Sequence, residues 1–210
     1  MYINLKTRNY IDISDKIIGD DKPTYFIADI AANHNGDIQR AINLIHLAAE
    51  AGADAAKFQH FEAQSIVSDF GFKALGEQQS HQAKWSKTVF EVYRDAEVDL
   101  SWTAQLKDAC DAAGITFFTS PYSFDLVDVV DPYVPAYKIG SGDITWTEIV
   151  SYIASKNKPV LLATGASDIA DVHRAMSSIL TLNNNIVLMQ CNTNYTASRE
   201  NFNHIHLNVI

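Results

Sequence analysis

Residues 25–59 read YFIADIAANHNGDIQRAINLIHLAAEAGADAAKFQ, two short apolar runs at 25–30 and 55–59 on either side of an amphipathic stretch. Apolar residues recur at three- and four-residue steps in the stretch 38–51, which predicts a helix. Asp37 is a typical residue for the first position before a helix, and Gly52 is a typical residue just after one. The stretch therefore predicts a strand, a helix and a second strand.

The same alternation continues to the end of the chain. Further short apolar runs predict strands, and the amphipathic stretches between them predict helices. Near-continuous apolar runs are typical of parallel strands buried on both faces, so the order predicts a parallel α/β fold. The additional predicted strands are 116–119, 136–139, 160–163 and 186–191, and the additional predicted helices are 100–113, 145–155 and 168–180.

Two architectures fit this order, a (β/α)8 barrel of the TIM type and an open doubly wound sheet. The spacing of the elements favours neither, but nearly every predicted strand ends in small or polar residues. A barrel gathers all its strand ends around one mouth, whereas an open sheet concentrates its ligand at one switch point. The barrel is therefore the expected fold. The strand ends are Asp29, 57–59, 119–120, 138–141, 164–165 and 192–195.

The segment 62–99 interrupts the regular spacing between the second strand and its helix. Such a length exceeds that of most connections in α/β units. Two interpretations stay open: one or two local helices packed on the rim of the barrel, or a lid over its mouth.

Composition limits the classes of partner. The chain has 16 Lys+Arg and 25 Asp+Glu, a formal net charge of −9, and no basic cluster. We therefore expect no nucleic-acid partner and no membrane partner. Two distant cysteines predict reduced thiols in a cytoplasmic protein. No run approaches membrane-spanning length, and the first residues lack the apolar core of a signal peptide.

Two lysines stand at predicted strand ends, Lys57 and Lys138. A lysine in a buried strand is costly unless it meets an anion or reaches solvent. One hypothesis is that both lysines converge on a phosphate or carboxylate; the alternative is that each pairs with a carboxylate of the core. The stretch 140–143, GSGD, offers backbone N–H groups and a hydroxyl beside Lys138, which suits an oxyanion.

Other polar residues allow more than one interpretation. Asp29 suits a sugar hydroxyl or acid–base chemistry, or an ion pair with Lys57 or Lys138. His34 suits contact with a substrate or, more commonly for a turn histidine, a bond to the backbone. His204 and His206 resemble a metal pair but lack a third ligand at suitable spacing.

Six stretches together resemble the sialic acid synthase family, which includes N-acetylneuraminate synthase and synthases of related nonulosonic acids. They occur in the family's order and spacing across about residues 15–210. The stretches are FIADIAANHNGD (26–37), AGADAAKFQHF (51–61), GITFFTSPYS (114–123), YKIGSGDITW (137–146), KPVLLATGAS (158–167) and CNTNYTAS (191–198).

The resemblance implies roles for individual residues. Phosphoenolpyruvate contacts are implied for Lys57, Thr119, Lys138, Ser141, Thr164 and Thr193, sugar contacts for Asp29, Gln59 and Tyr195, and catalysis for Asp29, Lys57 and Lys138. The family usually has Glu at the position of Asp29. It often has serine at that of Ala163, and Asn or Ser is common at that of Thr193.

The implied reaction joins phosphoenolpyruvate to an N-acetylated aldose similar to N-acetylmannosamine. C3 of phosphoenolpyruvate attacks the sugar aldehyde, water adds at C2, and phosphate leaves by C–O cleavage. The lysines hold the anion and stabilise charge, and a divalent metal, Mn or Mg, polarises the aldehyde. The family's metal ligands lie beyond residue 210, so we expect no metal ligand in this chain.

The resemblance also implies the domain organisation. Residues 1–23 form an extension, a short hairpin at the base of the barrel, and residues 24–210 form a barrel domain truncated after about six βα units. The last two units and an antifreeze-like domain are expected to be absent, so the chain alone is expected to be inactive. Family members commonly form homodimers. Two alternatives remain: a non-catalytic remnant that binds an anion or a partner, and a barrel aldolase or lyase with a Schiff-base lysine.

Overall fold

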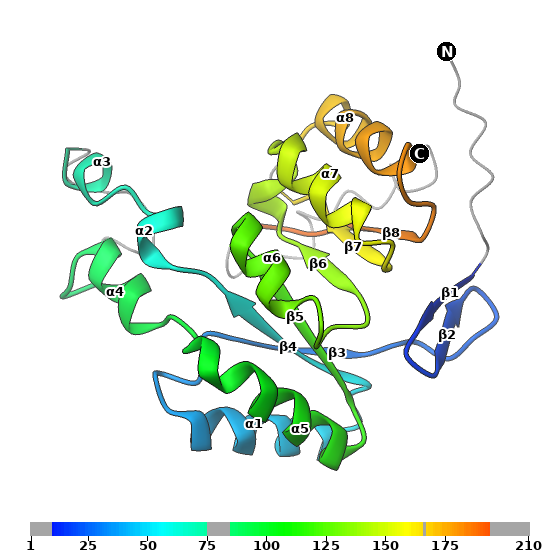
Figure 1. Cartoon of the computed structure of the whole chain (residues 1–210), viewed down its shortest axis with the longest axis horizontal. Coiled ribbons are helices and arrows are strands. Elements are labelled where there is room, and N and C mark those ends of the chain that lie inside the picture. The colour runs from blue at the N-terminus through cyan, green and yellow to red at the C-terminus, as the bar shows by residue number, and fades with distance from the viewer. Residues whose placement is uncertain (1–9, 75–84, 166, 194–210) are drawn as a thin grey trace. The chain divides into compact units, whose positions relative to one another are not determined.

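The computed structural model describes residues 10–74, 85–165 and 167–193 (Figure 1). The chain divides into two compact units: Phe26–Val134 forms one, and Met1–Tyr25 together with Pro135–Ile210 forms the other. The α/β alternation predicted from the sequence is confirmed. No helix in the described part of the chain is both long enough and apolar enough to cross a membrane.

The unit Phe26–Val134 is built on a parallel three-stranded sheet in the order β3-β4-β5. Helix α1 connects the first two strands, and helix α5 precedes the third; the two helices pack against each other. These elements are β3 (Ile27–Ala31), α1 (Ile38–Glu50), β4 (Ala55–His60), α5 (Thr103–Ala113) and β5 (Thr116–Pro121).

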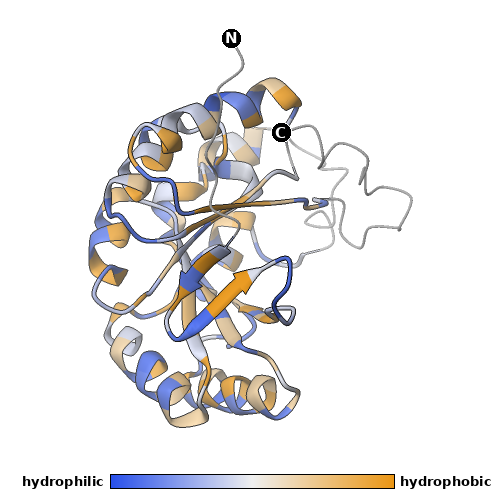
Figure 2. Cartoon of the chain, turned by 90° about the vertical axis from the view of Figure 1, so that its right-hand side faces the viewer, coloured by the Kyte–Doolittle hydropathy of each residue, from blue (hydrophilic) through white to orange (hydrophobic). Residues whose placement is uncertain are grey.

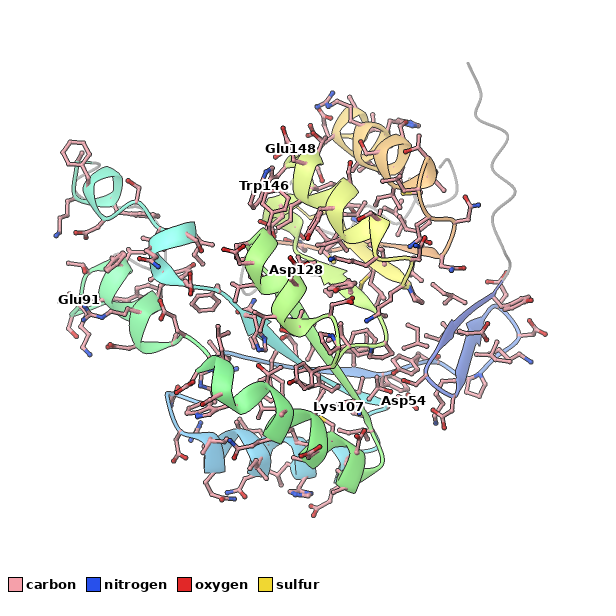
Figure 3. The ribbon with its side chains drawn as sticks, viewed as in Figure 1. Asp54, Glu91, Lys107, Asp128, Trp146 and Glu148 are labelled. Carbon is pink, nitrogen blue, oxygen red and sulfur yellow. The ribbon has the colours of Figure 1, made fainter. Side chains whose placement is uncertain are left out.

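Local signals explain where these elements begin and end. The Asp37 carboxylate accepts hydrogen bonds from the backbone N–H groups of Gln39 (2.8 Å) and Arg40 (3.2 Å), which caps α1 as predicted. Gly114 ends α5 in the left-handed conformation, at φ 71°. Asp54 (Figure 3) joins the starts of the strands: its carboxylate accepts from Phe26 N, and its carbonyl accepts from Thr116 N, both at 2.8 Å.

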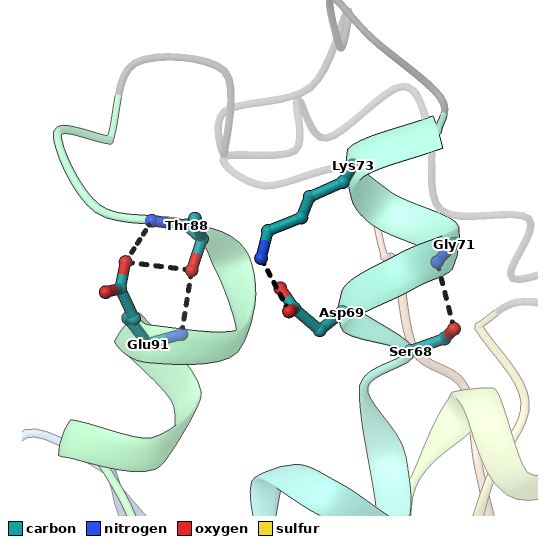
Figure 4. A network of polar contacts seen from close by, with 6 residues as sticks. All are labelled: Ser68, Asp69, Gly71, Lys73, Thr88 and Glu91. Atoms are coloured by element: carbon teal, nitrogen blue, oxygen red, sulfur yellow. Dashed lines mark hydrogen bonds and ion pairs between the residues drawn. The ribbon is translucent and has the colours of Figure 1, made fainter.

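The segment 62–99 contains short helices, described for residues 62–74 and 85–99. Figure 4 shows the local bonds that hold two of them. The Thr88 hydroxyl accepts from Glu91 N (3.2 Å) while the Glu91 carboxylate accepts from Thr88 N (2.9 Å), a capping box at the start of α4. Lys73 and Asp69 form an ion pair along α3. The helices of this unit beyond the sheet connections are α2 (Ala63–Ile66), α3 (Asp69–Ala74), α4 (Val89–Asp95), η2 (Leu100–Trp102) and α6 (Phe124–Val130).

The second unit contains an antiparallel hairpin, β1 (Tyr10–Ile13) with β2 (Lys16–Gly19), in which Tyr10 pairs with Gly19. It also contains a parallel sheet in the order β6-β7-β8. Helices α7 and α8 connect these three strands, and Trp146 and Glu148 mark the start of α7 (Figure 3). The elements are β6 (Tyr137–Ile139), η3 (Ser141–Asp143), α7 (Thr147–Ser155), β7 (Val160–Ala163), α8 (Ile169–Leu180) and β8 (Ile186–Met189).

Hydrophobic and hydrophilic residues are mixed along the helices (Figure 2). Helix α8 shows the consequence: four side chains spaced three or four residues apart are buried, namely Val172, Ala175, Met176 and Ile179. Their period matches one face of a helix. Burial of these apolar side chains stabilises the unit by removing them from water.

Candidate functional site

One face of the β3-β4-β5 sheet carries Lys57. The side chains of Asp29, Lys57 and Phe118 lie on one face because these residues are in register across the three strands. Lys57 Nζ lies 2.8 Å from Asp29 Oδ1, so Lys57 has an acidic partner. The lysine side chain is 9% exposed, whereas the Asp29 side chain is 60% exposed. The carboxylate is therefore a surface group rather than a core group, and an ammonium has two further N–H donors to offer a ligand.

Gln59 and Ser120 lie on the same face as Lys57. Gln59 stands two residues after Lys57 in β4 and is in register with Ser120 of β5. The Gln59 Nε2 atom donates a hydrogen bond to the Tyr122 hydroxyl, 3.2 Å away. The structure thus brings together a cation, a carboxylate, an amide and two hydroxyl-bearing residues near the carboxyl ends of β3, β4 and β5.

Thr119 does not belong to this face. It is in register with Phe58, whose side chain points to the opposite side of the sheet from Lys57. Its hydroxyl lies 2.7 Å from His60 Nδ1, and His60 Nε2 lies 3.0 Å from the hydroxyl of Thr103 in α5. Because its side chain contacts this buried histidine and not the face that carries Lys57, the geometry does not support Thr119 as a phosphoenolpyruvate contact; Ser120 is the neighbouring hydroxyl residue that lies on that face.

Two buried histidines lie behind the sheet. Burial, and secondarily the charge of His34, lowers the pKa of His60 to about 4. Burial also lowers the pKa of His34, whose Nδ1 accepts from Gly36 N at 3.2 Å. The backbone interpretation of His34 is therefore the one the structure supports. Burial disfavours the charged form of both rings, which suits packing and hydrogen bonding.

Lys138 and Asp143 lie in the other unit, at the end of β6. Lys138 Nζ donates to the carbonyl of Ile139 at 3.1 Å. Burial raises the pKa of Asp143 to about 6, and the positive charge of Lys138 opposes that rise. A carboxyl group with this pKa exchanges protons readily near neutral pH.

Three strand ends of this unit meet at Gly165. Gly165 N donates to Ser141 Oγ (3.0 Å), and the Thr193 hydroxyl donates to the carbonyl of Gly165 (3.3 Å). A Cβ atom at Gly165 would lie 2.9 Å from Ser141 Oγ and 3.0 Å from Thr193 Cγ2. A side chain at this position would therefore force Ser141 or Thr193 to shift. The Thr164 hydroxyl donates to the carbonyl of Met189 at 3.0 Å, so it links β7 to β8.

The structure thus groups the predicted residues in two sets. Asp29, Lys57 and Gln59 lie on one face of the β3-β4-β5 sheet. Ser141, Thr164 and Thr193 lie near the carboxyl ends of β6, β7 and β8, in the unit that contains Lys138. Convergence of the two lysines stays a prediction. Tyr195, His204 and His206 lie outside the described residues.

Two residues of these sets, Asp143 and Tyr122, were not predicted from the sequence as functional candidates, and Ser120 was expected only as part of the polar strand end 119–120. The two-residue period of a strand, counted from Phe118, was the available signal for Ser120. Asp143 gave a weaker signal, an acidic residue five positions after a strand lysine. Nothing in the sequence indicated that Tyr122 contacts Gln59, because this bond joins residues 63 positions apart.

These features define an α/β protein with polar and charged side chains at the carboxyl ends of parallel strands, where such folds hold their ligands. The NeuB family model matches residues 44–210, and the chain belongs to the NeuB family. It is thus a member of the family of sialic acid synthases and related enzymes.

Named relatives agree with this membership. The chain is 33% identical to the spore coat polysaccharide biosynthesis protein SpsE of Bacillus subtilis, over 90% of this chain and 50% of that protein. It is 32% identical to the N,N'-diacetyllegionaminic acid synthase of Legionella pneumophila, over 88% of this chain and 53% of that protein. The chain therefore spans about half the length of the curated relatives it matches.

Solved structures support the fold. The N-acetylneuraminic acid synthetase of Leptospira borgpetersenii superposes with a TM-score of 0.78 at 23% identity, over 94% of this chain and 64% of that one. The crystal structure of B. subtilis SpsE superposes with a TM-score of 0.73 at 30% identity, over 90% of this chain and 49% of that one.

Proposed function

We propose that the full-length protein condenses phosphoenolpyruvate with an N-acetylated aldose to give a nonulosonic acid and phosphate. Membership of the NeuB family supports this reaction class. The observation that carries the proposal is the sheet face on which buried Lys57 contacts exposed Asp29 and lies next to Gln59 and Ser120. Such a face combines a cation for an acidic substrate with hydrogen-bonding groups for a sugar.

Each set of residues has a proposed role. Lys57 and Ser120 are proposed to contact phosphoenolpyruvate, and the family resemblance assigns Lys138, Ser141 and Thr193 to the same substrate. Charge-assisted hydrogen bonds from ammonium groups are the strongest contacts available to these anions. Thr164 is proposed to act indirectly, because its hydroxyl donates a hydrogen bond to the backbone carbonyl of Met189 and so links β7 to β8.

Asp29, Gln59 and Tyr195 are proposed to contact the sugar. Carboxylate and amide oxygens accept hydrogen bonds from sugar hydroxyl and acetamido N–H groups. The short Asp29 side chain also contacts Lys57, so it lies between the two proposed substrates.

The proposed reaction needs three proton transfers. C3 of phosphoenolpyruvate forms a bond to the aldehyde carbon, and the aldehyde oxygen takes up a proton to become a hydroxyl. Water adds at C2 and loses a proton. The C2–O bond to phosphate then breaks as the new C2 hydroxyl loses its remaining proton and becomes the keto group, and the departing phosphate takes up a proton. Asp143 is proposed to take the proton from water, because its raised pKa suits a base that works near neutral pH.

We also propose that residues 24–210 form part of a (β/α)8 barrel, with residues 1–23 as an extension at its base. The parallel sheets and alternating helices support this arrangement. Within the described residues, no three His, Cys, Asp or Glu side chains are arranged to hold a metal ion. We therefore assign no step to the Mn or Mg that the family resemblance implies.

The test measures phosphate release by the full-length protein with manganese, phosphoenolpyruvate and a panel of sugars. Release should require an N-acetylated aldose and should be absent with phosphoenolpyruvate alone. No release with any sugar of a broad panel would contradict the proposal. Borohydride trapping of pyruvate on Lys57 or Lys138 would instead indicate an aldolase or lyase.

A further inference from the structure

Gln59 is held by a tyrosine that the proposed reaction does not use. Gln59 Nε2 donates to the Tyr122 hydroxyl at 3.2 Å, from one strand end to the residue after the next strand. Tyr122 is fixed at its backbone, because its N–H donates to the carbonyl of His60 at 3.0 Å. The bond therefore connects a proposed sugar contact to a rigid extension of the β4-β5 ladder.

Aromatic contacts fix the Tyr122 ring as well. The ring packs edge-on against Phe61, with centroids 6.2 Å apart and an interplanar angle of 84°. Phe61 is buried, and it contacts Tyr93 of α4 with centroids 5.6 Å apart. Glu97, just after α4, accepts a hydrogen bond from Ala63 N at 2.5 Å. The segment 62–99 thus supports the tyrosine that supports Gln59.

A side-chain amide has two different ends, and its last torsion angle is only weakly restricted. The nitrogen donates and the carbonyl oxygen accepts. When the Tyr122 hydroxyl accepts from Nε2, the Gln59 carbonyl oxygen is turned away and can accept from a ligand. A phenol hydroxyl can donate as well as accept, so it fixes this orientation while its own proton is directed away from Gln59; without the hydroxyl, the amide can rotate and present either end.

We propose that Tyr122 is a positioning residue that sets the orientation of the Gln59 amide, so that its carbonyl oxygen accepts a hydrogen bond from an O–H or N–H group of the sugar. This inference rests on the proposed function, which places Gln59 at the sugar.

The kinetic test compares Tyr122→Phe with the wild-type full-length protein. Removal of one orienting hydrogen bond should raise KM for the sugar roughly 3- to 10-fold and leave kcat and KM for phosphoenolpyruvate nearly unchanged. Tyr93→Phe is the matched control, because it removes a hydroxyl from a ring that also packs on Phe61. That control should leave all three constants unchanged.

A second variant separates orientation from simple packing. In Gln59→Glu both carboxylate oxygens accept, so there is no orientation to set. The effect of Tyr122→Phe on sugar KM should therefore shrink in the Gln59→Glu background. An undiminished effect, or an equal rise in KM for both substrates, would show a general structural role and overturn the inference.

An NMR measurement tests the contact without turnover. In protein labelled with ¹⁵N-glutamine, the side-chain NH₂ signal that disappears in Gln59→Ala identifies Gln59. That signal should shift in Tyr122→Phe and stay in place in Tyr93→Phe; an unmoved signal overturns the inference. If the signal shifts but Gln59→Ala leaves sugar KM unchanged, the sugar assignment fails while the contact stands.

Discussion

At the scale of single residues, Lys57 offers the sharpest test of anion binding. Replacement by Met keeps most of the volume and removes the charge. Asp29 then loses its partner, but its side chain is 60% exposed and regains contact with water, so the fold should survive. We expect Lys57→Met to raise KM for phosphoenolpyruvate about 100-fold, as loss of a charge-assisted contact would.

Lys107 provides the control for that variant. It lies on α5, where it forms a surface ion pair with Asp111 (Figure 3). Surface pairs of this kind contribute only about 0–1 kcal/mol. Lys107→Met makes the same chemical change away from the proposed site and should leave the kinetics unchanged. Equal effects of the two substitutions would contradict a specific role for Lys57.

Asp143 should determine how kcat falls on the acidic side of the pH–activity profile. Burial raises its pKa to about 6, so the carboxylate form is lost as the pH falls through 6. If this carboxylate takes the proton from water, kcat should fall below pH 6. Asp143→Asn should lower kcat about 100-fold and remove that step from the profile. A profile with the same step in the variant would assign the titration to another group.

At this scale the sequence predicted the types of the candidate residues better than the face of the sheet to which each side chain points. An ion pair of Asp29 with Lys57 or Lys138 was one of two interpretations left open by the sequence, and the structure has the pair with Lys57. The sequence selected Thr119 rather than Ser120, although side chains one position apart point to opposite faces. Both residues are buried hydroxyls, so burial alone could not separate them. The register of β5 with β4 distinguishes them, because Ser120 pairs with Gln59 and Thr119 pairs with Phe58.

At the scale of elements, His60 joins two strands and a helix. Its ring bonds to Thr119 of β5 and Thr103 of α5, and burial lowers its pKa to about 4. The folded state therefore binds fewer protons than the unfolded state between pH 4 and 6.5. The contribution of His60 to the free energy of unfolding is fully present above pH 6.5 and falls by up to about 3 kcal/mol toward pH 4.

The measurement compares urea unfolding of wild type and His60→Gln at pH 4.5 and 7. The variant cannot titrate at this position and should lose this part of the pH dependence. Asp143 acts in the opposite sense, because its raised pKa means that stability falls as the pH rises from about 4 to 6. Parallel pH dependence in wild type and His60→Gln would contradict the assignment.

Gly165 tests how closely the ends of β6, β7 and β8 approach. A Cβ atom there would lie within 3.1 Å of Ser141 Oγ, Thr193 Cγ2 and the Cys191 carbonyl. We expect Gly165→Ala to destabilise the fold by about 1–3 kcal/mol, as overpacking does. Gly142→Ala is the matched control, since nothing lies within 4 Å of its Cβ position. Equal unfolding midpoints in urea for the two variants would contradict this account.

The sequence predicted the main elements well, and the reason is local. The predicted helix 168–180 corresponds to α8 at Ile169–Leu180, because the Asp168 cap and a 3.6-residue apolar period both lie within the segment. Helix α6, Phe124–Val130, was missed because its seven residues give too few turns for a clear period. The helices of 62–99 were expected only in general terms, since their short apolar patterns depend on packing.

At the scale of the whole molecule, the family resemblance implies that Lys57 and Lys138 contact the same phosphoenolpyruvate. Calorimetric titration of the full-length protein should then give one site per chain. Lys57→Met and Lys138→Met should each weaken binding. In the double variant the losses should depart from additivity by about 1 kcal/mol or more, because both side chains contact the same ligand. Additive losses, or two sites per chain that respond separately to the two substitutions, would show that the lysines serve different anions.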